Sequence, residues 1–156
     1  GRKTIIGHKK EDKGQYDIPL YTHGAYSGAM MIRKSVIEQT GMLPRNFFIY
    51  FDDSDVSARI LKNGYKILYQ PKAVVYNRAS LLPSEKSAIN VYYRTRNRIL
   101  FMRRNSNLLQ FSIFLSFFFF LTIPATTTKF LIKRQFTHLQ SFFKGIWWNV
   151  KMRAAA

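Results

Sequence analysis

A stretch of 24 residues without a charged side chain limits most strongly what this chain can fold into. It covers residues 105–128, and residues 108–123 within it, LLQFSIFLSFFFFLTI, are mostly Phe, Leu and Ile. Sixteen such residues fall slightly short of the ~20 that cross a bilayer as a helix, unless the Ala-Thr run after Pro124 contributes. The chain is also too small and too basic to wrap this stretch as a buried core helix. We therefore predict contact with a membrane.

Basic residues flank the apolar stretch on both sides. Arg103 and Arg104 precede it, and Lys129, Lys133 and Arg134 follow it. A single membrane span normally shows a charge difference between its two ends, so these flanks favour a re-entrant or in-plane anchor. Basic and aromatic side chains then alternate through residue 153, which predicts an interfacial amphipathic helix. We expect residues 105–156 to form membrane-associated helices.

The overall charge points to an anionic partner. The chain has 25 Lys and Arg against 8 Asp and Glu, a formal net charge of +17, which attracts phosphates or anionic lipids. The basic residues become denser from Arg94 onward, beside the apolar stretch, so a membrane surface is favoured over nucleic acid. We predict no nucleic-acid partner, because no RRM, KH or zinc pattern is present. The lack of cysteine excludes disulfides and thiolate chemistry.

Three of the eight acidic residues lie within four positions, in residues 47–59, FFIYFDDSDVSAR. One interpretation is a helix start, with Asp52 or Asp53 as N-cap and all three acids facing the positive end of the helix dipole. The other places the acids at the rim of a cleft, where burial and like charge suit one carboxylate to proton transfer. Spacing alone favours the helix start, and both interpretations can hold together.

The first 104 residues show the order of elements typical of an α/β layer. Small residues at 24–28 predict a tight turn into a buried strand at 29–32, and residues 33–41 predict a short helix. A helix is expected from Asp55 to Asn63, strands at 65–70 and 73–76, and a basic amphipathic helix at 88–104. Strands alternating with helices indicate an α/β fold with ligands at strand ends, where the acids fall.

Several motifs in this region together resemble a known family. Residues 27–80, from SGAMM through FFIYFDDSD to YNRAS, resemble the C-terminal half of the catalytic domain of family 2 glycosyltransferases. They are most similar to the bacterial rhamnosyltransferase-like members that build surface polysaccharides. Residues 92–98, YYRTRNR, resemble that subgroup's YYxTRNR segment, and residues 14–16 its DxGQY stretch. The motifs keep their order, so the resemblance implies the C-terminal half of a GT-A domain over residues 1–104.

The resemblance implies an inverting transfer of a sugar, such as rhamnose, from a nucleotide-diphosphate donor to a glycan or lipid-linked acceptor. It also implies a location at the cytoplasmic face of the bacterial inner membrane. In the family, an acidic pair after an FFxYF-like segment supplies the catalytic base. The second acid of that pair falls on Asp53, and Asp52 stands where Glu is usual. A carboxylate on the acceptor side takes the proton of the attacking hydroxyl.

Further positions match the family's substrate-binding residues. The small-residue segment that lines the sugar pocket falls on Ser27, Gly28 and Ala29. Asp55 and Arg59 match a following D…R pair, which we assign to orienting the acidic turn.

Three more substrate contacts are expected from polar side chains later in the chain. Asn77 stands where the family usually has a His that helps to bind metal or diphosphate, and Asn is a poorer ligand. Arg94 and Arg96 could hold a substrate diphosphate or lipid phosphates, or form a solvated face. The full-length enzyme is expected to use a divalent metal, Mg or Mn. We expect its ligands mostly in a donor-binding half upstream, so we assign no metal ligand here and expect this chain alone to be inactive.

Two other functions stay open from the sequence. The chain could be a non-catalytic, basic membrane-binding module derived from the same fold. It could also be a metal-dependent phosphotransferase or nuclease that uses the DDxD cluster of residues 52–55. The first predicts binding without turnover, and the second predicts phosphate release that needs divalent metal and no sugar acceptor.

Overall fold

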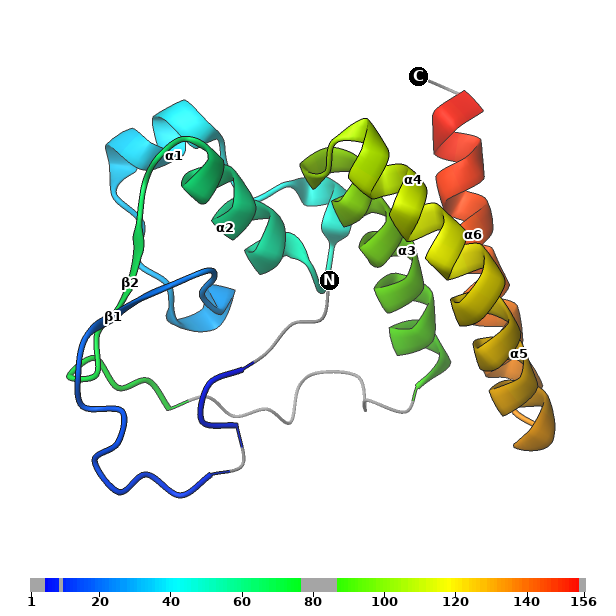
Figure 1. Cartoon of the computed structure of the whole chain (residues 1–156), viewed down its shortest axis with the longest axis horizontal. Coiled ribbons are helices and arrows are strands. Elements are labelled where there is room, and N and C mark those ends of the chain that lie inside the picture. Colours follow the sequence, from blue (N-terminus) through cyan, green and yellow to red (C-terminus); the bar gives the residue numbers. More distant parts are fainter. Residues whose placement is uncertain (1–4, 9, 77–86, 155–156) are drawn as a thin grey trace.

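The structure is a computed structural model that describes residues 5–8, 10–76 and 87–154, and every structural statement below concerns these residues. They form an N-terminal unit of short elements beside a unit of long helices (Figure 1). The N-terminal unit contains β1 (Leu20–Thr22), η1 (Ser27–Ala29), α1 (Lys34–Thr40), η2 (Arg45–Phe47), α2 (Asp52–Lys62) and β2 (Ile67–Tyr69). The helical unit contains α3 (Ala88–Asn105), α4 (Leu108–Phe117), the π-helix η4 (Phe118–Thr122), α5 (Ile123–Ile132) and α6 (Phe136–Ala154).

The predicted α/β fold, and with it the GT-A half over residues 1–104, is wrong. The described residues are mostly helical, and their single sheet has two antiparallel strands, with Leu20 opposite Tyr69. Residues 27–29 form a 3-10 turn in place of a strand entry, and Met31 is fully exposed. Residues 73–76 form no strand. A β-rich run becomes a strand only where a partner offers a free edge and a layer to cover it, and here β1 is the one partner of β2.

The helices of the N-terminal unit were predicted more accurately than its strands. Helix α1 ends at Gly41, whose φ of 81° suits glycine. Helix α2 begins at Asp52, three residues before the predicted start. The two helices share a small core in which three buried aliphatic side chains meet partly buried neighbours; the buried three are Val36, Val56 and Ile60. This core is small, so polar contacts with α3 contribute much of the positioning of α2.

Helices α4, η4 and α5 follow one another without a break as one helix of 25 residues, Leu108–Ile132, here called the apolar helix. It starts with a capping box between Asn107 and Gln110. The helix continues through Pro124, so the Ala-Thr run after it does contribute to the length. The preceding π turn closes with a bond from the Ile123 N–H to the Phe118 carbonyl oxygen, and a proline near a helix start needs no donor. By length and composition the apolar helix could cross a membrane.

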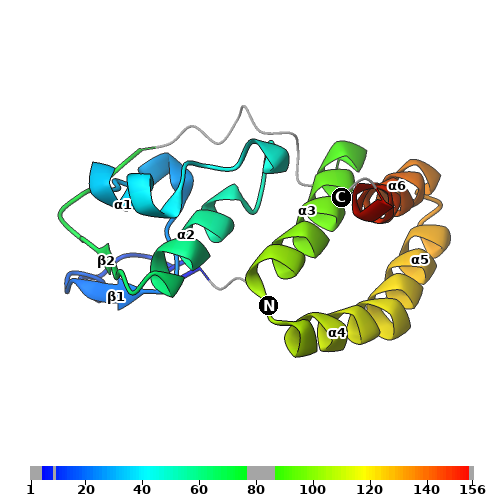
Figure 2. The same ribbon diagram turned by 90° about the horizontal axis from the view of Figure 1, so that it is seen from above.

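Three long helices pack as α3, α6 and the apolar helix (Figures 1 and 2). Helix α6 runs in the same direction as α3, since Gly145 lies against Tyr92 and Asn149 bonds both Arg96 and, further along, Arg103. The apolar helix runs the opposite way. The common core is largely phenylalanine; its buried members are Ile99, Phe114, Phe118, Phe130 and Phe142.

Gly145 lets α6 approach α3 closely. A Cβ atom at this position would lie 2.8 Å from the Tyr92 carbonyl oxygen and 3.1 Å from the Arg96 nitrogen, and both are backbone atoms that cannot swing aside. We predict that Gly145→Ala destabilises the helical unit by about 1–3 kcal/mol, the usual cost of overpacking. Thermal unfolding followed by circular dichroism measures this effect. The control is Gln140→Ala on an exposed position of α6, and equal melting temperatures for the two variants would contradict the packing.

Candidate functional site

The chain reaches the acidic cluster through a turn with unusual backbone geometry. Three residues between Phe47 and Asp52 have positive φ, namely Phe48 at 60°, Tyr50 at 64° and Phe51 at 68°. Residues with a Cβ atom rarely adopt this left-handed region, and each such residue costs on the order of 1–3 kcal/mol unless its surroundings enforce it. We call residues 46–53 the acid-bearing turn. Its geometry must be held from outside.

Asn97 of α3 holds the acid-bearing turn. Its side chain is fully buried, and Nδ2 donates to the carbonyl oxygens of Phe47 at 2.8 Å, Ile49 at 2.6 Å and Tyr50 at 3.0 Å. These are carbonyls that a regular helix or strand would have satisfied along the backbone. Within the turn, the Phe47 carbonyl oxygen also accepts from the Ile49 N–H at 2.7 Å, and the amide of Asn97 joins the three carbonyls to α3.

Arg96 completes this support. Its Nε donates to Asn97 Oδ1 at 2.8 Å, and its guanidinium also donates to the Asn46 carbonyl oxygen. The guanidinium lies 4.3 Å from the ring centroid of Trp148 on α6 and 5.1 Å from that of Tyr93. Arg96 is only 8% exposed, so it holds the turn rather than presenting its charge to a phosphate. Arg94 is exposed and lies over the ring of Tyr50.

The three acids occupy the first turn of α2, as the helix-start interpretation predicts. None of them is the N-cap, which is Phe51 and makes no side-chain capping bond. Asp53 is 5% exposed, and its Oδ1 accepts from the Ser54 N–H at 2.6 Å and the Ser54 hydroxyl at 3.0 Å. Asp52 is half-buried and therefore more open to solvent. Asp53 is thus held in place at the end of a strained turn, and Asp52 lies beside it.

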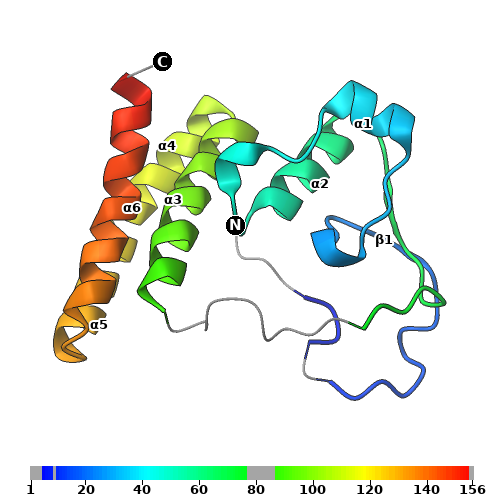
Figure 3. The same ribbon diagram turned by 180° about the vertical axis from the view of Figure 1, so that it is seen from behind.

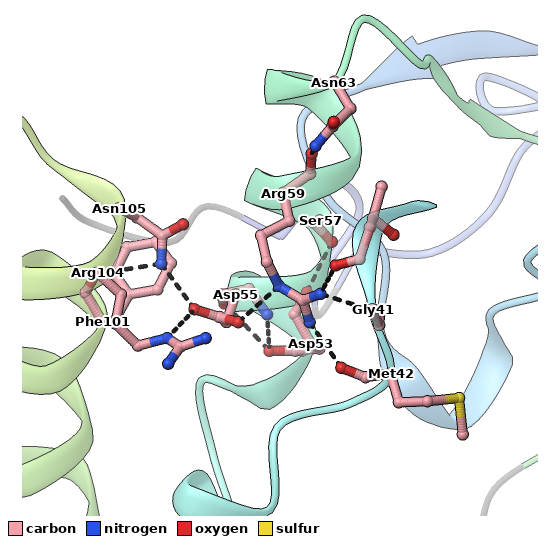
Figure 4. A network of polar contacts seen from close by, with 12 residues as sticks. Gly41, Met42, Asp53, Asp55, Ser57, Arg59, Asn63, Phe101, Arg104 and Asn105 are labelled. Carbon is pink, nitrogen blue, oxygen red and sulfur yellow. Dashed lines mark hydrogen bonds and ion pairs between the residues drawn. The ribbon is translucent and has the colours of Figure 1, made fainter. Parts of the chain in front are cut away.

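Asp55 has a different environment from its neighbours (Figure 4). It is fully buried, and Oδ2 pairs with Arg59 Nε at 3.0 Å. Oδ1 pairs with Arg104 Nε at 3.2 Å and accepts from Asn105 Nδ2 at 2.8 Å. Arg59 also donates to three carbonyls at the end of α1, those of Thr40, Gly41 and Met42. These contacts support the orienting role assigned to Asp55 and Arg59, since they fasten α2 to both α1 and α3.

Ser57 links the acids to the small-residue segment. Its hydroxyl donates to the Asp53 carbonyl oxygen at 2.7 Å and accepts from the Ala25 N–H at 3.3 Å. The predicted pocket residues Ser27, Gly28 and Ala29 follow as the exposed turn η1. Asn77 lies outside the described residues.

Two hollows in the described part of the chain lie away from the acids. One of about 210 Å³ is lined by residues of β1, α2 and β2, and a shallow groove of about 630 Å³ lies on α6. Neither is lined by Asp52 or Asp53. The expected cleft at the rim of the acids is therefore not among these hollows.

Sequence reasoning assigned no role to Asn97 or Ser57. Both are buried polar residues on amphipathic helices. For Asn97, the signal in the sequence was an uncharged amide within the basic TRNR run, residues 95–98. That signal says that position 97 differs from its neighbours, but not which segment it contacts.

The expected divalent metal finds no ligand set in the described residues, where no three His, Asp or Glu side chains are close enough to hold an ion. Asp55 cannot join Asp52 and Asp53 in such a set, because both of its oxygens are taken by arginines and Asn105. The DDxD cluster of residues 52–55 therefore does not present three free carboxylates together.

No protein family, curated protein or solved structure with which the chain was compared matches it.

Proposed function

We propose that this chain is part of a membrane-associated inverting glycosyltransferase and that the acid-bearing turn supplies its catalytic base. One observation carries the proposal. Three residues in left-handed backbone are kept there by a buried amide and a buried arginine, directly before two adjacent carboxylates. Strain of this kind persists where the surroundings over-determine it, and it gathers at functional sites.

The chemistry needs a carboxylate at a fixed place on the acceptor side. The acceptor oxygen attacks the anomeric carbon, the nucleoside diphosphate leaves from the opposite face, and the hydroxyl proton passes to the base. We assign the proton to Asp53, and Asp52 lies beside it on the more open side of the turn. No step is routed through a metal, because this part of the chain has no ligand set for one.

The link between the turn and the helical unit suits an acceptor in the membrane. Helix α3 holds the acid-bearing turn through Asn97 and packs along α6 through Tyr92 and Thr95. A lipid-linked acceptor at the surface of the membrane would therefore meet the carboxylates at a defined height. We propose that the enzyme works at the cytoplasmic face of the membrane. The donor would be a nucleotide sugar and the acceptor a glycan or a lipid-linked glycan, as the family resemblance implies.

The test compares the variants Asp53→Asn and Asp52→Asn, each made in the full-length protein in its native host. We expect Asp53→Asn to lower sugar transfer by about 10²–10⁴-fold, the contribution of a positioned general base, and Asp52→Asn to lower it less. Membranes containing each variant receive labelled nucleotide sugars, and label in the glycan and lipid fractions is counted. Glu38→Gln, a change of an exposed acid on α1, is the control. Full activity of Asp53→Asn would refute the assignment of the base.

A non-catalytic membrane-binding module is the second candidate. The observation that favours it is the absence of Asp52 and Asp53 from the lining of either hollow, together with a large exposed apolar surface on the helical unit. This candidate predicts that the unaltered protein binds vesicles but transfers none of the donor sugars offered.

A further inference from the structure

We propose that the apolar helix and α6 lie flat in one leaflet of an anionic bilayer and do not cross it. The apolar helix is long enough to span a bilayer. Whether it crosses the bilayer or lies in its plane therefore depends on the parts of the protein that pack beside it. The inference concerns attachment only, and it stands or falls separately from sugar transfer.

The surface available to lipid is broad and apolar. On the apolar helix, exposed side chains follow the whole length, from Leu108 (83% exposed) through Phe120 (71%) to Ile132 (77%). Helix α6 adds Phe136 and Trp147, which line the shallow groove on its outer side. Only about one tenth of the most apolar window, 11%, is buried inside the protein. Water is a poor solvent for such a surface, whereas hydrocarbon suits it.

The N-terminal unit prevents the spanning arrangement. It lies level with the long helices along their axes, on the far side of α3 (Figures 1 and 3). The middle of α3 carries the bonds to the acid-bearing turn through Arg96 and Asn97, and the end of α3 carries the ion pair to Asp55. A bilayer crossed along these axes would therefore immerse the exposed Arg94 and the carboxylates at mid-depth. Ionised groups at that depth are strongly disfavoured.

Charge around the apolar surface matches an anionic headgroup layer. Residues 86–156 contain twelve Lys and Arg and no acid. Exposed Lys129, Lys133 and Arg134 lie at one end of the apolar helix, and exposed Lys144 lies near the middle of α6. In a spanning arrangement Lys144 would sit near the bilayer centre. In a flat arrangement its side chain reaches the headgroups while the ring side chains of α6 stay in hydrocarbon.

The absence of native cysteine makes single-cysteine labelling a direct test. Ser106→Cys and Lys133→Cys place thiols at the two ends of the apolar helix, and Lys13→Cys marks the N-terminal unit, where Lys13 is exposed. Sealed inside-out membrane vesicles and intact spheroplasts are treated with a membrane-impermeant maleimide. We expect all three thiols to react from the same side.

Two outcomes overturn the proposal. Reaction of Lys133→Cys only from the side opposite to Lys13→Cys means that the helix crosses. Failure of Lys133→Cys to react from either side before solubilisation, with reaction afterwards, means that the turn dips into hydrocarbon as a re-entrant hairpin.

A second measurement determines how deep Trp147 lies in the bilayer and needs no cysteine. Trp148→Phe leaves Trp147 as the single tryptophan and keeps a ring beside Arg96. Its fluorescence is measured in bilayers with bromine placed either near the headgroups or near the chain ends. Stronger quenching by the shallow bromines, and weaker vesicle binding when phosphatidylglycerol is replaced by phosphatidylcholine, are expected. Stronger quenching by the deep bromines, or equal binding to both lipids, contradicts an anionic in-plane surface.

Discussion

Replacing Asp55 by alanine is expected to lower the free energy of unfolding by about 3 kcal/mol. The carboxylate is fully buried and pairs with Arg59 at 3.0 Å and Arg104 at 3.2 Å. Removing one member of a buried ion pair leaves the other charge without compensation, which usually costs about 3–5 kcal/mol. We take the lower end, because the side chains of Arg59 and Arg104 are 19% and 39% exposed and water replaces part of the lost contact.

Urea unfolding in detergent micelles, followed by far-ultraviolet circular dichroism, measures this effect. The matched control is Glu38→Gln, which removes an acid from the exposed i,i+4 pair of Lys34 and Glu38, 3.7 Å apart. Exposed pairs contribute about 0–1 kcal/mol, so the control variant should unfold almost as the unaltered protein does. If Asp55→Ala is as stable as Glu38→Gln, then the network in Figure 4 does not fasten α2 to α3.

Asn97→Ala is expected to release the acid-bearing turn and to lower the free energy of unfolding by about 2–4 kcal/mol. The change removes the donor shared by the carbonyls of Phe47, Ile49 and Tyr50. A buried polar group left without its partner costs about 1–3 kcal/mol. The positive φ angles of the turn also lose the contact that enforces them. The turn should therefore relax before the rest of the protein unfolds.

Hydrogen exchange followed by mass spectrometry separates these two effects. Peptides covering residues 46–55 should lose protection in Asn97→Ala, while peptides from the apolar helix should keep theirs. Asn63→Ala is the control, because the Asn63 side chain is exposed and donates to a single carbonyl, that of Arg59, at 2.8 Å. If the unaltered protein transfers sugar, Asn97→Ala should transfer much less although both carboxylates remain. Unchanged exchange in residues 46–55 would show that Asn97 does not hold the turn.

The sequence predicted best where the deciding interactions lie within one segment. Helix α3 was expected at 88–104 and is found at Ala88–Asn105, because its amphipathic spacing is a local property. The glycine stop of α1 and the acids in the first turn of α2 follow from local backbone and dipole effects. The uncharged stretch likewise predicted an apolar segment, and it forms a helix long and apolar enough to cross a membrane.

The predictions that needed a partner elsewhere in the chain were less accurate. The runs at 29–32 and 73–76 are apolar but find no neighbouring edge, so the α/β layer does not form. Arg96 was expected at a phosphate and is instead buried among Tyr93, Trp148 and the acid-bearing turn.

The sequence by itself determined the chemistry that is available: a long apolar helix with basic flanks, and three carboxylates at a helix start. Only the tertiary structure decided which role each carboxylate has and what lies beside the helices. It ties Asp55 to two arginines, leaves Asp52 and Asp53 at the strained turn, and sets a polar unit beside α3. Each of these outcomes depends on contacts between residues about 50 positions apart, such as Asn97 with Phe47 and Arg104 with Asp55. Such pairings follow from the packing of whole elements, which local propensity does not encode.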